Sequence, residues 1–121
     1  MIADISAWQR VAEKLDDIEA LVMRLESAVG EGVDPRASVP LLFRDFHNLK
    51  SMLSTEGLES TARLVHKAES CLDALRSGKG SFSPGLMDGL IAVVDHARSV
   101  VRRQEDADDP SIASQIGRAH V

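Results

Sequence analysis

Two histidines, a lysine and a glutamate occur in pairs whose spacing could support nucleophilic chemistry. Lys50 follows His47 by three residues, and Glu69 follows His66 by three residues. Side chains three residues apart share a face of a helix, so each pair would lie together if its segment is helical. His47 directly follows Phe46, and Glu69 stands where the spacing of its neighbours predicts an apolar residue. Ionisable groups at the edge of a core are informative because burying them without partners is costly.

The chemistry that suits this set is the transfer of a phosphoryl group. A neutral imidazole is a competent nucleophile toward phosphorus near neutral pH, since its reference pKa is about 6.5. Glu69 would hold one ring nitrogen and stabilise the cation that develops as the other nitrogen bonds to phosphorus. Lys50 would balance the added phosphoryl charge, and His66 would orient Glu69. Taken singly, each residue also has an interpretation without chemistry. The histidines can be ordinary surface or core residues, the glutamate can extend its carboxylate to solvent, and the lysine can be solvated.

Convergence of the four residues depends on how the two segments pack. The segments are joined by a tight turn near Gly57, so they should lie side by side and antiparallel. Counting equal distances on each side of Gly57 places His47 level with residues 66–69. We therefore predict that the four side chains meet.

Four stretches with apolar residues at spacings of three and four predict four amphipathic helices. Their expected ranges are 4–29, 38–57, 58–78 and 83–103. Ser38 and Ser83 are candidate N-caps, each with a proline in the following first turn, and Gly78 is a candidate C-cap. The apolar stripe of the last helix comprises Leu86, Leu90, Val93, Ala97, Val100 and Val101.

Helices of this kind, joined by short loops, most economically form an all-α, antiparallel up-down-up-down four-helix bundle. The composition agrees, because aromatic residues make up only 3% of the 121 residues and there is no tyrosine. We expect the bundle to occupy residues 1–103.

Residues 104–121 differ in character from the rest of the chain. They begin with an acidic run, contain Pro110 and have few apolar residues, so we expect a linker or disordered tail. Residues 116–121 can be encoded by ATC GGA AGA GCA CAC GTC, which resembles a common sequencing-adapter read. On that interpretation the natural protein continues, and the alternative is an ordinary tail. In either case His120 is given no functional role.

Charge and cysteine content narrow the function classes. A net charge of -5 argues against a nucleic-acid binder, which must neutralise phosphates. The single cysteine, Cys71, can form no internal disulfide, which favours a reducing, cytoplasmic setting. The N-terminal residues lack the pattern of a signal peptide, and no apolar run reaches the ~20 residues that span a bilayer. We expect a soluble, cytoplasmic protein.

Three motifs in this order resemble the histidine-phosphotransfer (HPt) domain, especially the N-terminal domain of CheA-type chemotaxis kinases. They are FRDFHNLK at 43–50, GL at 57–58 and HKAESCLDALRSG at 66–78. The family pattern runs F-R-x-x-H-x-x-K-G, then a glycine, then H-x-x-E-x-x-L-D-x-x-R-x-G. Motif order, helix spacing and the distance between motifs all agree, and the resemblance covers about residues 5–103.

The resemblance implies a role for each matching residue. His47 matches the phosphorylated histidine, Lys50 matches the lysine beside it, and His66 and Glu69 match hydrogen-bonding partners from the next helix. Ser51 departs from the pattern, since the family usually has glycine there so that a partner can approach closely. Its small hydroxyl is expected to slow transfer or to alter partner choice without preventing phosphorylation.

The resemblance also implies a phosphoryl carrier in two-component signalling that is not itself a kinase. No Gly-rich phosphate loop is present in these residues. The expected partners are a response-regulator receiver domain and a histidine kinase catalytic domain, the latter in cis if the chain is a fragment of a CheA-like kinase. A receiver presents an aspartate with a divalent cation, so we expect Mg²⁺ on that partner and no cofactor on this chain. Arg44 and Lys50 bracket His47 and would face the receiver's acidic pocket.

Two other functions remain open from the residues alone. His47, His66 and Glu69 are all possible ligands of a metal-binding bundle, although the Glu-x-x-His order of di-iron bundles is reversed here. The second alternative is a helical protein-docking module in which His47 is incidental.

Overall fold

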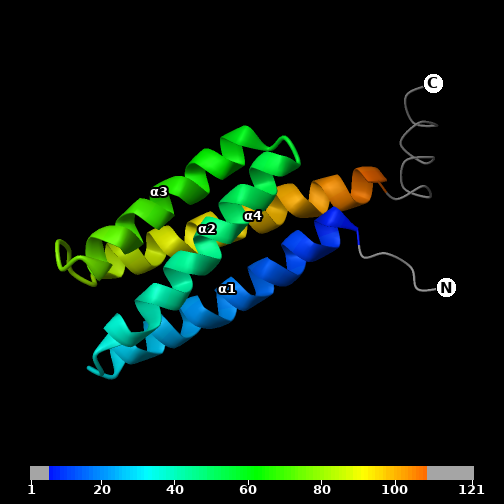
Figure 1. Cartoon of the computed structure of the whole chain (residues 1–121). Coiled ribbons are helices and arrows are strands. Elements are labelled where there is room, and N and C mark those ends of the chain that lie inside the picture. Colours follow the sequence, from blue (N-terminus) through cyan, green and yellow to red (C-terminus); the bar gives the residue numbers. More distant parts are fainter. Residues whose placement is uncertain (1–5, 109–121) are drawn as a thin grey trace.

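The computed structural model describes residues 6–108, which form four long helices and one short 3-10 turn and contain no strand. The helices are α1 (Ala7–Gly30), α2 (Val39–Thr55), α3 (Glu59–Arg76) and α4 (Pro84–Asp108), and the turn η1 (Pro35–Ser38) precedes α2. Helix α1 packs on α2 and α4, and α3 packs on α2 and α4. The result is the expected all-α, up-down-up-down four-helix bundle, with α1 and α3 diagonally opposite (Figure 1).

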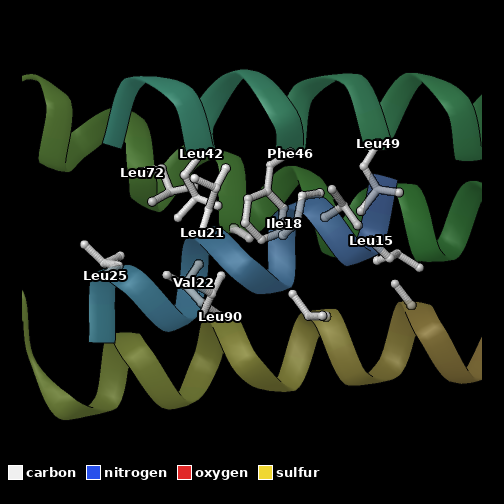
Figure 2. Close-up of a cluster of buried hydrophobic side chains, with 14 of the residues drawn as sticks. Leu15, Ile18, Leu21, Val22, Leu25, Leu42, Phe46, Leu49, Leu72 and Leu90 are labelled. Atoms are coloured by element: carbon white, nitrogen blue, oxygen red, sulfur yellow. The ribbon is translucent and has the colours of Figure 1, made fainter. Parts of the chain in front are cut away.

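Buried apolar side chains from all four helices meet along the bundle axis (Figure 2). Phe46 is the largest of the fully buried side chains, and Ile18 and Leu49 are also 0% exposed. Deeply packed cores of this kind resist small displacements, which fixes the rotation of each helix about its own axis. In α4 the buried positions include Met87 and Val94, while the expected Leu86 and Val93 are only half-buried.

The turn between α2 and α3 is set by Gly57, whose φ of 83° is a left-handed conformation that favours glycine. Gly57 N donates to Ser54 O at 3.0 Å, and Leu58 N donates to Leu53 O at 2.9 Å. These two bonds form a Schellman motif that satisfies carbonyls at the end of α2 and turns the chain sharply into α3. The expected antiparallel pairing of these two helices is confirmed.

The beginnings of α1 and α2 differ from the sequence expectations, whereas the beginning of α4 agrees with them. Helix α1 begins at Ala7, with Ser6 Oγ accepting a bond from Gln9 N at 3.1 Å, and not at residue 4. Ser38 ends the 3-10 turn and makes no side-chain cap bond, because the chain before α2 is already helical there. At Ser83 the expected cap is confirmed, since its Oγ accepts from Leu86 N at 3.1 Å.

The last helix is longer than expected, because α4 continues to Asp108 and not to Arg103. No glycine or proline lies between these two residues, so nothing in the sequence interrupts the helix. Residues 105–107 are exposed, so this extension adds little to the core. The remainder of the expected linker, including 116–121, lies outside the described residues.

Within the described part of the chain, none of the helices has both the length and the hydropathy needed to cross a membrane. Cys71 is exposed and has a free thiol.

Candidate functional site

The α2–α3 hairpin brings the four candidate residues to one level, as the count from Gly57 predicts. His47 lies on the outer side of α2 immediately after the buried Phe46, and its side chain is 52% exposed. Glu69 lies on the side of α3 that packs against α2, and its side chain is only 9% exposed. An accessible imidazole therefore stands over a carboxylate that the bundle holds in place.

The imidazole of His47 is oriented by a hydrogen bond to this carboxylate. His47 Nδ1 lies 2.9 Å from Glu69 Oε1. An ionised carboxylate can only accept, so Nδ1 carries the proton and donates it. In the neutral ring, the free lone pair is then on Nε2. The geometry leaves Nε2 as the ring nitrogen whose lone pair is available for bonding.

Lys50 and His66 both lie near the other oxygen of Glu69. Lys50 Nζ is 3.0 Å from Oε2 and forms an ion pair with it. His66 Nδ1 is 3.7 Å from the same atom, which is too long for a hydrogen bond. The hydrogen bond expected between His66 and Glu69 is therefore not formed in this structure. Oε2 is buried and receives no hydrogen bond of regular geometry from the described residues, so the Lys50 ammonium compensates its charge.

These contacts keep Glu69 ionised. Burial of Glu69 raises the pKa of its carboxyl group, but the hydrogen bond with His47 and the ammonium of Lys50 outweigh it. The net effect is a pKa below the ordinary value for glutamate. The carboxylate is thus negative at neutral pH, as a group must be if it stabilises a positive imidazole.

Arg44 and Ser51 lie on the exposed side of α2, one turn to either side of His47. The Arg44 side chain is 68% exposed, and its Nε lies 3.8 Å from Asp45 Oδ1. The Ser51 side chain is exposed, and its carbonyl oxygen accepts a bond from Thr55 Oγ1 at 2.9 Å. Both residues lie on the face of α2 that carries His47, and among the described residues neither forms a hydrogen bond or ion pair with Glu69.

Sequence reasoning missed two contacts of α2, one with α3 and one with α1. Arg76 from the end of α3 lies over the ring of Phe43, one turn before His47, at 4.3 Å from the ring centroid. Asp45 is 5% exposed and pairs with Lys14 of α1 at 3.5 Å. The count from Gly57 could have indicated the first contact, because it brings the end of α3 to the first half of α2. Nothing in the α2 sequence alone indicates the partner of Asp45.

Residues 6–108 contain no candidate metal site, because no three or more histidine, cysteine or acidic side chains among them are close enough together to hold an ion. His47 and His66 share Glu69 with Lys50, whose ammonium occupies the position beside Oε2. A cation there would be repelled by the lysine.

Comparison with known proteins agrees with the geometry. Residues 8–100 match the model of the Hpt domain family, so the chain belongs to this family of histidine-phosphotransfer domains. The chain is also similar to the chemotaxis protein CheA of Cereibacter sphaeroides, with 30% identity over 79 residues. That match covers 65% of this chain and 11% of the CheA protein, so the chain spans a small part of this relative's length. No solved structure matches the chain.

Proposed function

We propose that this domain carries a phosphoryl group on Nε2 of His47 and exchanges it with the aspartate of a receiver domain. Histidine phosphotransfer in phosphorelay signalling is the activity of the family to which the chain belongs. The observation that supports the assignment to His47 is its 2.9 Å hydrogen bond to the buried Glu69, combined with a half-exposed ring.

In the proposed step, the Nε2 lone pair attacks the phosphorus of an aspartyl phosphate on the receiver. A nitrogen–phosphorus bond forms, the bond from phosphorus to the aspartate oxygen breaks, and the aspartate leaves as a carboxylate. The proton stays on Nδ1, so the ring becomes a cation stabilised by Glu69. Lys50, whose ammonium pairs with the same carboxylate, would also attract the phosphoryl oxygens. The reverse step follows the same path.

The wider setting is part of the same proposal. The similarity to a chemotaxis protein supports a place in chemotaxis-type signalling, with a histidine kinase catalytic domain supplying the phosphoryl group in cis or in trans. Arg44 and Ser51 would contact the receiver, Mg²⁺ would be held by the receiver, and the reaction would take place in the cytoplasm. His66 would line the site beside Glu69.

The direct test is phosphorylation by phosphoramidate, followed by incubation with a purified receiver domain. We expect the wild-type chain to gain one acid-labile phosphoryl group and to pass it to the receiver. His47→Gln should gain none and should keep its helical circular dichroism spectrum. His96→Gln, which changes an exposed histidine on α4, is the matched control and should behave as wild type.

Acid-labile phosphate retained on His47→Gln would overturn the assignment. Complex formation with the receiver but no phosphoryl transfer in either direction would favour a docking module instead.

A further inference from the structure

A groove between α1 and α4 has an apolar floor and an acidic rim that the proposed phosphotransfer does not use. The groove is about 140 Å³ and is lined by Val22, Met23, Ile91 and Val94, with Glu26 and Asp95 at its edge. Met23 is 63% exposed, although a methionine side chain is largely apolar. Val22 and Val94 are each only 3% exposed, so Met23 and the half-buried Ile91 are the apolar side chains that a partner would meet first.

Of the acidic side chains that line this groove, one is ion-paired and two are not. Glu19 is neutralised, because its Oε2 lies 2.6 Å from Arg98, which also pairs with Asp16 at 3.0 Å. Glu26 and Asp95 are exposed and form no ion pair with another residue of the described range 6–108. The apolar floor is therefore flanked by two acidic side chains that have no ion-pair partner in this range, while Arg98 and Arg102 line the adjoining cavity together with Asp95.

The groove lies across the bundle from the proposed phosphorylation site. His47 and Glu69 belong to the α2–α3 pair, whereas the groove belongs to the α1–α4 pair on the other side of the core (Figure 1). A partner in the groove would leave His47 open to a receiver domain.

We propose that this groove binds an amphipathic helix of a partner protein that bears lysine or arginine beside its apolar face. A helix is the element that fits between two packed antiparallel helices, since its apolar side chains at spacings of three and four enter the groove. Its basic residues would lie over Glu26 and Asp95, where each charge finds an opposite charge that is now unpaired. An acidic helix would be repelled there.

The test uses two synthetic 18-residue peptides with leucines along one helical face, one with lysines and one with glutamates beside them. Each is titrated into the ¹⁵N-labelled full chain and followed by NMR. We expect the lysine peptide to give saturable shifts centred on Val22, Met23 and Val94. The glutamate peptide should bind at least about tenfold more weakly. Phosphoramidate should still phosphorylate His47 in the presence of saturating lysine peptide.

Charge reversal separates a specific groove from general attraction to an acidic protein. The double variant Glu26→Lys and Asp95→Lys should weaken binding of the lysine peptide about tenfold. The double variant Glu56→Lys and Glu59→Lys, which makes the same change in net charge at exposed positions of the α2–α3 turn, should change it less than about twofold. Equal effects of the two variants would overturn the proposal, as would shifts centred on α2 or α3. A dimer of the free chain that Met23→Glu dissociates would assign the groove to a second copy and overturn it as well.

Discussion

Replacing Glu69 by glutamine removes one negative charge from beneath His47 while keeping the size and shape of the side chain. The amide oxygen can still accept the Nδ1 hydrogen bond, so the ring keeps its orientation. A hydrogen bond to a charged acceptor contributes about 1.5–3 kcal/mol, and a neutral one contributes about 0.5–1.5 kcal/mol. The midpoints of these ranges differ by about 1.3 kcal/mol, which corresponds to roughly a tenfold loss of rate if the difference applies fully in the transition state.

The assay is the first-order rate of phosphorylation by phosphoramidate, measured by intact mass under conditions where the wild-type reaction is complete. Because the small donor needs no docking surface, the rate reports on the imidazole and its partners alone. Glu69→Gln should react about tenfold more slowly than wild type. Glu59→Gln, an exposed glutamate in the first turn of the same helix, is the matched control and should react at the wild-type rate.

The same variant has a pH-dependent effect on stability. The pKa of Glu69 is lowered in the folded protein, so its ionised form contributes stability that is fully present above the ordinary glutamate pKa of about 4.3. This contribution is lost as pH falls through the lower folded value. The urea midpoint of wild type should therefore exceed that of Glu69→Gln at pH 7, and the gap should shrink at pH 3. An unchanged phosphorylation rate, or a stability gap that grows on acidification, would refute the reasoning.

Two further predictions concern the docking surface and the core. Ser51→Leu should block phosphoryl transfer from a receiver but leave the phosphoramidate reaction intact. A misplacement of about 1 Å can lower the rate of transfer ~100-fold, whereas a small donor needs little clearance. Equal transfer from a receiver to wild type and to Ser51→Leu would show that this surface is not the docking site. Asp45→Asn should lower the free energy of unfolding by about 1–2 kcal/mol, because it leaves the partly buried Lys14 without its partner. The free energy of unfolding is measured by urea denaturation and compared with that of the control Asp17→Asn, which changes an exposed aspartate. The phosphorylation of His47 should be the same in Asp45→Asn as in wild type.

The sequence predicts the bundle and the level of the site because both depend on local rules. Helical spacing identifies four helices, and a tight turn at Gly57 sets the register of α2 against α3. Two features of the structure were not predicted from the sequence: the partner of Asp45 and the end of α4. The partner of Asp45 comes from α1, and only the packing of the whole bundle brings Lys14 to it. The end of α4 was expected at Arg103 from the change to an acidic composition, although the sequence has no helix breaker between Arg103 and Asp108, so this feature could have been predicted.

Each of the four candidate residues of the site directly follows a buried core residue on the same helix. His47 and Lys50 each follow a residue that is 0% exposed, Phe46 and Leu49 respectively. Glu69 follows Ala68, which is also buried. A closely packed core resists rotation of α2 or α3, so the neighbours of the buried residues are held in fixed directions. The 2.9 Å contact between His47 and Glu69 is therefore formed in the free protein, and the proposed transfer would need no ordering of the imidazole.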